Sequence, residues 1–551
     1  MARSRRRPRV SVLGCAGIFL AAWLLAVFLG AQVIGRHRRD LKPKTEPSEK
    51  AVEPKKAFEK KAVEKAVEPK KASLGNNCAE MLEGSRGFAG TRYWRRSGEP
   101  GAAELDFPRS YRGKNNDLYC SFEVDNGGFN NVRMALETVA VFAHATGRRL
   151  VVPPKQRVYL LKETHAKNLK AYHGLGAFLN FDALGEVLPL MTGVDFAETR
   201  AKKKVAKTLA EAAESTGEPK PRKAWREWQR SEADLLPRWD PMREVVIFGD
   251  GDANSTDPPW RELSPRSFAT NKRRLRFLDE TTASKPWIHF ASNGSAGYRL
   301  FSHWYTFFLF MDGPTNSFYK RFVRDRLRYT DDVFCAAGAV VRHIGTSFSS
   351  VHVRRGELQY AKVRISAEAW RDSLQQWLLP HEKLFVLSDE RNRSFFQPIK
   401  DAGFDLVFLE DLFDDQNFDP NKLGMLEQLV AANPLSRTFT GTWFSTFSSY
   451  VARLRAYYGH RPDTVYYAAP HDKHRAMHDT YRSHHPEFPF YTREWALGWD
   501  GIDLRPPTPQ RHDPRLSKTL PKHRPYADLP LLSHHNGGGG KKNNVPGGRR
   551  R

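Results

Sequence analysis

The chain has 551 residues, with 40% hydrophobic and 12% aromatic residues and a formal net charge of +26. That length fits two to four domains, and the 13 Trp and 35 Phe residues supply enough apolar surface to exclude a wholly disordered chain. The charge lies mainly at the ends, since residues 1–75 carry 18 basic against 7 acidic side chains and residues 506–551 carry 10 against 2. No basic and aromatic stripe accompanies it, so the charge does not indicate nucleic-acid binding.

The N-terminal part of the sequence predicts a membrane anchor followed by a spacer. Residues 12–31 form an uncharged apolar run, which spans ~30 Å as a helix and exceeds the apolar core of a cleaved signal peptide, the alternative. We therefore expect a cytoplasmic tail over 1–11, a transmembrane helix over 12–31 and a low-complexity stalk over 32–75. Residues 506–551 are expected to form a disordered basic tail.

Three Asn-x-Ser/Thr tripeptides are candidate glycosylation sites, at Asn254, Asn293 and Asn392. Together with an N-terminal anchor, they favour a luminal body in the Golgi or endoplasmic reticulum membrane. The four cysteines are too few for a disulfide-dense scaffold, and no pair has the spacing of a zinc finger. In an oxidising lumen, Cys78 and Cys120 are predicted to pair because they are nearest in sequence.

The body alternates short apolar runs with helical stretches, a pattern that predicts α/β architecture with mostly parallel sheets. Strands are expected at Arg149–Val152, Phe348–Val353, Leu384–Leu387 and Leu406–Leu409, and helices over Arg133–Thr146 and Ser366–Leu379. The Lys- and Glu-rich segment 199–237 is predicted to be a polar helical insertion, since a core segment would need more aliphatic residues.

Two motifs have the residue types that bind phosphate. The first, Asn126-Gly127-Gly128-Phe129-Asn130, is a glycine turn at a helix start, where backbone N–H groups are free to approach an anion. The second, His352-Val353-Arg354-Arg355, follows an apolar strand, and alternation places His352 and Arg354 on one side of it. The planar guanidinium suits diphosphate oxygens, whereas a surface salt bridge with Glu357 is the structural alternative.

Two further motifs follow in the C-terminal half of the body. Asp389 comes directly after the third apolar run, where a carboxylate either accepts hydrogen bonds from a ligand or caps a helix. The fourth motif is Gly441-Thr442-Trp443-Phe444-Ser445-Thr446-Phe447-Ser448, which leads into a helix. Its hydroxyl and N–H groups form either an anion site or an ordinary N-cap.

In this order, the four motifs resemble those of the GDP-fucose protein O-fucosyltransferase family, most of all the branch that acts on thrombospondin type 1 repeats. The resemblance extends from about Leu118 to Gly459. It implies a GT-B-like fold with two Rossmann-like domains facing a cleft, expected here over 76–335 (including the insertion) and 336–505. It also implies inverting transfer of fucose from GDP-fucose to Ser or Thr of a secretory-pathway protein, with no metal or other cofactor.

The same resemblance implies roles for individual residues. The residues expected to bind the donor are Asn126, Gly127, Gly128, Phe129, Asn130, His352, Arg354, Asp389, Ser445, Thr446 and Phe447. Within this set, Arg354 is the expected catalytic group, because a site without a metal must neutralise the departing GDP by other means. Asp389 is expected at the guanine end of the donor.

The sequence departs from that branch where carboxylates are expected. Gly127 replaces a glutamate that is the proposed general base, and Leu454 replaces a second glutamate in the following helix. Asp125 or Glu123 is the remaining candidate for the base. Two alternatives therefore stay open. The first is a related enzyme that uses another nucleotide sugar, such as a rhamnose donor, or a polysaccharide acceptor. The second is a catalytically silent luminal protein that binds glycan or protein.

Overall fold

The computed structural model describes residues 117–124, 127–155, 158, 174–214, 221–235, 244–248, 274–291, 308–310, 313–356, 364–414, 418–443, 445–458, 460 and 464–468. The predicted tail, anchor, stalk and basic C-terminal segment lie outside these residues, as do Cys78, Asn254 and Asn293. Among the described residues, no helix has both the length and the apolar character needed to cross a bilayer.

The first sheet is parallel and has the strand order β3-β2-β1-β7-β4. Its strands are β1 (Tyr119–Phe122), β2 (Arg149–Val152), β3 (Leu190–Thr192), β4 (Asp234–Leu235) and β7 (Trp287–Phe290). The predicted strand at β2 is confirmed. The predicted helix before it is α3 (Phe129–Ala145), which ends just before Gly147, a residue with φ of 66°. A left-handed backbone conformation at this position ends the helix and favours glycine.

Both faces of the first sheet are covered, because alternate side chains of its strands enter different cores. Cys120 and Phe122 of β1 pack toward α3, whereas Tyr119 packs on the other face against Trp225 and Trp228. These two tryptophans lie on α7, inside the segment that we predicted to be a polar insertion. That prediction is wrong for the apolar side of the insertion, where two indole rings supply most of the buried area together with Ala206 and Leu209.

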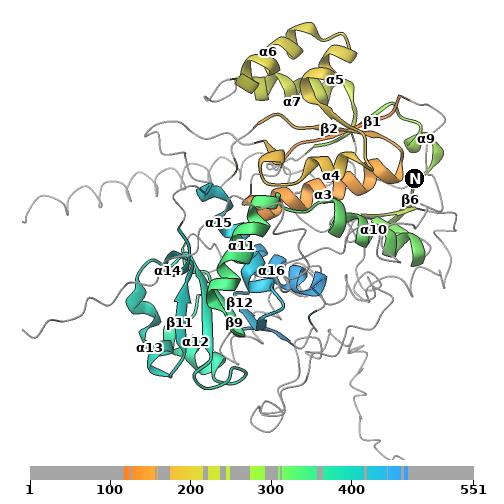
Figure 1. The fold of residues 1–551 in the computed structure, drawn as a ribbon. Helices are drawn as coiled ribbons and strands as arrows, with labels where there is room; N and C mark the ends of the chain where they lie inside the picture. Colours follow the sequence, from red (N-terminus) through yellow and green to blue (C-terminus); the bar gives the residue numbers. More distant parts are fainter. Residues whose placement is uncertain are drawn as a thin grey trace, which may run out of the picture. The chain divides into compact units, whose positions relative to one another are not determined.

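The second sheet is also parallel, with the order β11-β10-β9-β12-β13. Its strands are β9 (Phe348–Val353), β10 (Lys383–Ser388), β11 (Asp405–Phe408), β12 (Ser436–Gly441) and β13 (Val465–Tyr467). Leu384 and Val386 of β10 face one core, and Phe385 and Leu387 face the other. Helices therefore cover both faces of this sheet (Figure 1).

The remaining elements connect these sheets or extend them. A third parallel sheet, β6-β5-β8, has no counterpart in the sequence predictions. It consists of β5 (Glu244–Phe248), β6 (Arg274–Phe277) and β8 (Phe308–Phe310). The helices are η1 (Leu175–Ala177), α4 (Phe181–Gly185), α5 (Gly193–Thr199), α6 (Lys203–Glu214), α7 (Pro221–Glu232), α9 (Glu280–Ala283), α10 (Gly313–Arg326), α11 (Asp331–Ile344), α12 (Ala367–Leu374), η5 (Arg393–Phe396), α13 (Gln397–Asp401), α14 (Leu409–Leu412), η6 (Pro420–Lys422), α15 (Leu423–Ala432) and α16 (Thr446–Tyr457).

The predicted α/β class and the mostly parallel sheets are confirmed. The boundary that we predicted at residue 335 falls inside α11. The predicted helix over Ser366–Leu379 begins as expected, with Ser366 accepting a hydrogen bond from the Ala369 N–H, but it ends at Leu374. Trp377 instead lies after the helix and donates its indole N–H to Thr440 Oγ1 at 2.8 Å.

The predicted disulfide between Cys78 and Cys120 is wrong. Cys120 is a free thiol on β1, fully buried in the core, and burial raises its pKa to about 12. Cys335, on α11, is disulfide-bonded. Nearness in sequence misled the prediction, because Cys120 points into the core between its strand and α3.

Candidate functional site

The candidate site lies at the carboxyl edge of the second sheet. Strands β9, β10 and β11 follow one another in one direction, and the chain then crosses back to place β12 on the other side of β9. In open α/β sheets, ligands bind at such a reversal of strand order, beyond the carboxyl ends of the strands. Three of the predicted segments start there, with Arg354 after β9, Asp389 after β10 and Thr442 after β12.

The backbone around Arg354 is held by Thr442, which sequence reasoning did not assign. The Thr442 hydroxyl donates to the carbonyl of His352 at 2.7 Å and accepts from the N–H of Arg354 at 3.0 Å. Thr442 is 1% exposed. It therefore continues the pairing of β9 with β12 beyond the last strand residue and fixes the point at which Arg354 leaves the sheet.

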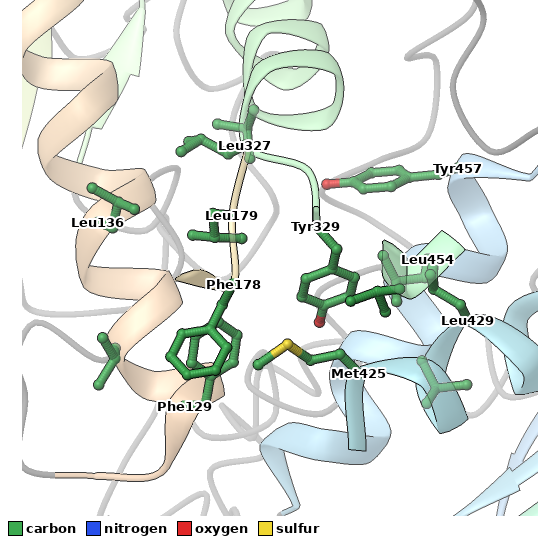
Figure 2. Close-up of a cluster of buried hydrophobic side chains, with 14 of the residues drawn as sticks. Phe129, Leu136, Phe178, Leu179, Leu327, Tyr329, Met425, Leu429, Leu454 and Tyr457 are labelled. Atoms are coloured by element: carbon green, nitrogen blue, oxygen red, sulfur yellow. The ribbon is translucent and has the colours of Figure 1, made fainter. Parts of the chain in front are cut away.

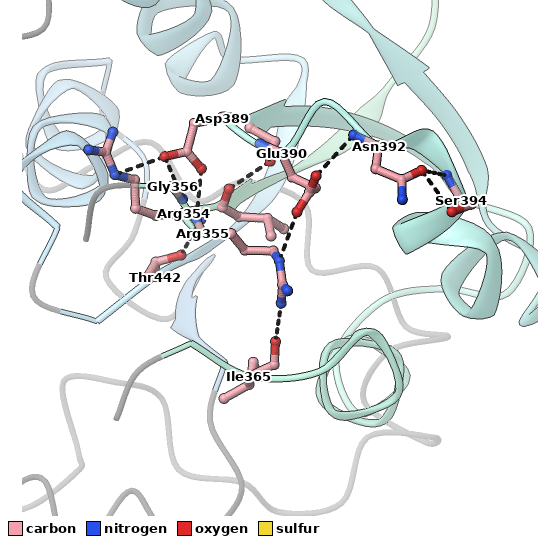
Figure 3. Close-up of polar contacts among 11 residues, drawn as sticks. Arg354, Arg355, Gly356, Ile365, Asp389, Glu390, Asn392, Ser394 and Thr442 are labelled. Carbon is pink, nitrogen blue, oxygen red and sulfur yellow. Dashed lines mark hydrogen bonds and ion pairs between the residues drawn. The ribbon is translucent and has the colours of Figure 1, made fainter. Parts of the chain in front are cut away.

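The side chain of Arg354 is held by Asp389, as Figure 3 shows. Arg354 Nε lies 3.1 Å from Asp389 Oδ2. The carboxylate also accepts from the N–H groups of Arg355 at 2.7 Å and Gly356 at 3.0 Å. A Cβ on Gly356 would lie 2.6 Å from Asp389 Oδ2, so the loop approaches this closely only with glycine. The terminal amino groups of Arg354 make no contact with the described residues, and the side chain is 21% exposed.

Arg355 has a different environment from that of its neighbour. Its guanidinium pairs with Glu390 at 3.0 Å, donates to the Ile365 carbonyl at 3.0 Å and lies 4.0 Å from the centre of the Phe395 ring. Arg355 therefore forms the kind of surface salt bridge that was the alternative to ligand binding, with Glu390 as its partner. Glu357 lies outside the described residues.

His352 is buried beside the first turn of α16. Its ring stacks on Phe447 with centroids 4.4 Å apart, and its Nδ1 lies 2.7 Å from Ser448 Oγ. Burial, with a smaller effect of Arg354, lowers the pKa of His352 to about 3. The imidazole is therefore neutral at physiological pH. Ser445 precedes α16, and Thr446 and Phe447 form its start, so the predicted residues of this motif and His352 are brought together.

The glycine motif occupies the start of α3. Gly128 is its N-cap in an extended conformation, and Asn130 is 8% exposed. Gln428 of α15 joins the two parts of the site, since its amide lies 3.5 Å from Asn130 Oδ1 and 3.3 Å from the Phe447 carbonyl. Phe129 packs in the hydrophobic core, edge-on to Phe178 (Figure 2). Asp125 and Asn126 lie outside the described residues.

The surroundings of Glu123, a candidate base, and of Leu454, which replaces an expected glutamate, are both defined. Glu123, after β1, is held by Arg230 at 2.5 and 2.8 Å and by Arg226 at 3.3 Å. Burial would raise its pKa, but His289, Arg230 and Arg226 together bring it below the usual value. Glu123 is therefore a poor proton acceptor. Leu454 is fully buried among apolar side chains near Leu429 and Tyr329, as Figure 2 shows.

A buried ion network lies under the site and links α3 with α16. Glu137 accepts from Arg133 at 3.0 Å and from both terminal amino groups of Arg453 at 2.8 and 2.7 Å. Side chains of all three are at most 1% exposed. Sequence reasoning missed this network because its members are separated by up to 316 residues.

Glu427 is a second residue that the sequence does not single out. It lies on α15 and is half-buried, and burial, Glu410 and Asp389 raise its pKa to about 8. It is one helical turn beyond Gly424, where an added Cβ would lie 3.4 Å from the Phe447 ring. At neutral pH, this side chain is mainly protonated.

Within the described residues, no group of three or more His, Cys, Asp or Glu side chains is arranged to hold a metal ion. Asp250 and Asp252, whose spacing is that of a metal-binding Asp-x-Asp motif, lie outside those residues. At the carboxyl edge of the second sheet, the Asp389 carboxylate is already paired with Arg354, and the other groups are arginine, hydroxyl and N–H donors. Such groups are suited to an anionic ligand.

Comparisons with known proteins identify the family. The sequence profile of the GDP-fucose protein O-fucosyltransferase family matches residues 119–458, more than half of the chain. No curated protein matches the sequence. Among solved structures, POFUT1 in complex with GDP-fucose is 13% identical with a TM-score of 0.32, and the alignment covers 64% of this chain and 98% of POFUT1.

Two other solved structures are similar at comparable levels. For a variant of FUT1 from Arabidopsis thaliana in complex with GDP, identity is 11%, the TM-score is 0.34, and coverage is 66% of this chain and 72% of FUT1. For the NodZ alpha-1,6-fucosyltransferase co-crystallised with GDP, identity is 13%, the TM-score is 0.31, and coverage is 61% of this chain and 92% of NodZ.

Proposed function

Because the chain belongs to the GDP-fucose protein O-fucosyltransferase family, we propose that it transfers fucose from GDP-fucose to Ser or Thr hydroxyls of a protein, with inversion and without a metal ion. The environment of Arg354 is the observation that carries this proposal. Asp389 holds one edge of its guanidinium, and the terminal amino groups remain for a ligand at the carboxyl edge of the sheet.

The proposed mechanism stabilises the leaving group. As the bond between fucose and the diphosphate breaks, negative charge grows on the phosphate oxygens. Arg354 neutralises this charge, His352 donates a hydrogen bond from a neutral ring, and the free N–H groups at the start of α16 add a positive dipole. Because Asp389 orients Arg354 before the donor binds, little reorganisation accompanies the reaction. The predicted contact of Asp389 with guanine stays a prediction.

The acceptor hydroxyl must lose a proton, and we propose Asp125 for this step. Glu123 is unsuited to it, because Arg226 and Arg230 hold both of its oxygens. The substitution Asp125→Asn tests this proposed role. The catalytically silent alternative follows if the protein binds GDP-fucose but neither hydrolyses nor transfers it.

The reaction itself is tested with panels of donors and acceptors. Purified protein is incubated with several nucleotide sugars, a rhamnose donor included, and release of the nucleoside diphosphate is measured. Folded thrombospondin type 1 repeats and polysaccharides then serve as acceptors. Selective hydrolysis of GDP-fucose with transfer to the repeats is the expected result. Turnover of another donor, or transfer only to a polysaccharide, contradicts the proposal.

GDP is expected to bind the purified protein equally well with and without a divalent-metal chelator. The expected binding groups are arginine, hydroxyls and N–H dipoles, which need no metal to attract a diphosphate. Titration calorimetry in both buffers measures this. If the binding heat disappears in chelator and returns with manganese, the metal-free mechanism is wrong.

We also propose that the protein is a single-pass membrane protein with a luminal body in the Golgi or endoplasmic reticulum. In a eukaryotic cell, we expect it to remain with membranes during carbonate extraction and to shift in mobility after endoglycosidase treatment. Asn392 is exposed, as a glycan requires, and Asn392→Gln should reduce the shift. A soluble product that starts after about residue 35 would instead indicate a cleaved signal peptide.

A further inference from the structure

The hydroxyl of Ser448 lies between a backbone N–H and the ring of His352. The Thr442 N–H donates to Ser448 Oγ at 3.0 Å, and His352 Nδ1 lies 2.7 Å from the same oxygen. Ser448 is 0% exposed. In the described part of the chain, its hydroxyl makes no other hydrogen bond.

The directions of these hydrogen bonds follow from which groups are able to donate. A backbone N–H only donates, so the Ser448 oxygen is the acceptor toward Thr442. Among the described residues, the single hydroxyl hydrogen then has one acceptor within reach, which is Nδ1 of His352. We infer that Ser448 is a positioning residue that keeps Nδ1 unprotonated, so that His352 carries its proton on Nε2.

The surrounding contacts allow few other arrangements. The Phe447 ring stacks on the imidazole and fixes its plane. A Cβ on Gly441 would lie 2.8 Å from Ser448 Cβ and 2.9 Å from Ser448 Oγ, so only glycine admits the serine at this position. Burial keeps the ring neutral by lowering its pKa to about 3. A neutral ring has one N–H, and because Nδ1 accepts from Ser448, that N–H is at Nε2.

A proton on Nε2 has a direct consequence for the donor, and this step rests on the proposed function. His352 Nε2 makes no hydrogen bond with the described residues. The ring sits one residue before the carboxyl end of β9, two residues before Arg354 and on the same side of the strand. The Nε2–H is therefore available to donate to a diphosphate oxygen, while a ring with its proton on Nδ1 would present a lone pair to that anion.

The first sheet contains the same arrangement at its own reversal of strand order. The indole N–H of Trp287, which only donates, contacts Ser121 Oγ at 2.8 Å, and this oxygen lies 2.8 Å from His289 Nδ1. His289 Nε2 lies 3.6 Å from Glu123 Oε1. His289 is therefore a second buried histidine whose Nδ1 faces a serine hydroxyl, and it provides an internal reference for His352.

The tautomer is measured in the full-length protein, labelled with ¹⁵N-histidine, by long-range ¹H–¹⁵N correlation spectra. Comparison with His352→Gln identifies the signals of His352. We expect Nδ1 to resonate as a bare ring nitrogen and Nε2 as a protonated one. In Ser448→Ala, this fixed pattern should be lost while that of His289 is unchanged. By calorimetry, GDP affinity should fall about tenfold, as when a hydrogen bond to a charged group is lost.

Ser350→Ala is the matched control, since it removes another buried hydroxyl of β9 that contacts Ser436 and not His352. It should bind GDP as the wild type does. A wild-type spectrum with the proton on Nδ1 overturns the inference, even if Ser448→Ala fails to fold. Equal GDP affinity of Ser448→Ala and wild type also overturns it. If the wild type itself does not bind GDP, the proposed function fails, while the wild-type spectrum still decides the tautomer.

Discussion

Replacing Arg354 with alanine is expected to lower kcat by ~10²–10³, which corresponds to about 3–4 kcal/mol of transition-state stabilisation. The contact of Arg354 with the diphosphate strengthens as the glycosidic bond breaks, so the loss should fall on kcat more than on KM. Kinetics of GDP-fucose hydrolysis and transfer measure this effect, after thermal melts confirm that the variant folds.

Two further variants make the test specific. Arg354→Lys keeps the charge but loses the planar fork, so it should recover only part of the rate. Arg355→Ala removes a guanidinium that Glu390 and Phe395 hold away from Arg354, and kcat should stay within a fewfold of the wild type. Near-normal kcat in folded Arg354→Ala would show that Arg354 has only a structural role.

Glu137→Gln is expected to lower the free energy of unfolding by roughly 3–5 kcal/mol. The substitution preserves shape but leaves Arg133 and Arg453 buried without the carboxylate that both contact. Their charges would then remain in a site of low polarity, where an uncompensated ion is costly. Urea unfolding curves of the purified proteins measure the difference.

An exposed ion pair supplies the control for this prediction. Glu186 pairs with Arg326, and its side chain is 66% exposed. Glu186→Gln should therefore cost at most about 1 kcal/mol, because water screens the charges and solvates the partner that remains. If the two substitutions destabilise the protein equally, burial is not what makes the Glu137 network important.

The sequence predicts those parts of the site that lie within one short segment. Phe348, Val351 and Val353 indicate a short strand, and His352 and Arg354 are two residues apart, so the strand and the shared side of these two residues are predictable from the segment itself. The fold class follows in the same way from the repeated change between strand and helix patterns. The sequence also indicated the family, through four motifs in a fixed order.

Contacts between distant segments could not be predicted in this way. Thr442 contacts the β9 end across about ninety residues, and its motif gives no sign of this contact. The burial of Trp225 and Trp228 was missed because their helix is polar in composition, although two aromatic rings suffice to pack it on the sheet. Cys120 likewise stays unpaired because its side chain faces the core, a direction that its distance in sequence from Cys78 does not indicate.

The opposite acid–base properties of His352 and Glu427 bear on how the enzyme responds to the acidity of its surroundings. With a pKa of about 3, His352 keeps the same charge from mildly acidic to alkaline pH. Glu427 has a pKa of about 8, so it gains a negative charge beside Asp389 as the medium becomes alkaline. Its pKa is raised by folding, and stability therefore falls as pH rises from the ordinary value of a glutamate toward 8. Mildly acidic surroundings keep Glu427 uncharged and leave the hydrogen-bonding state of His352 as it is.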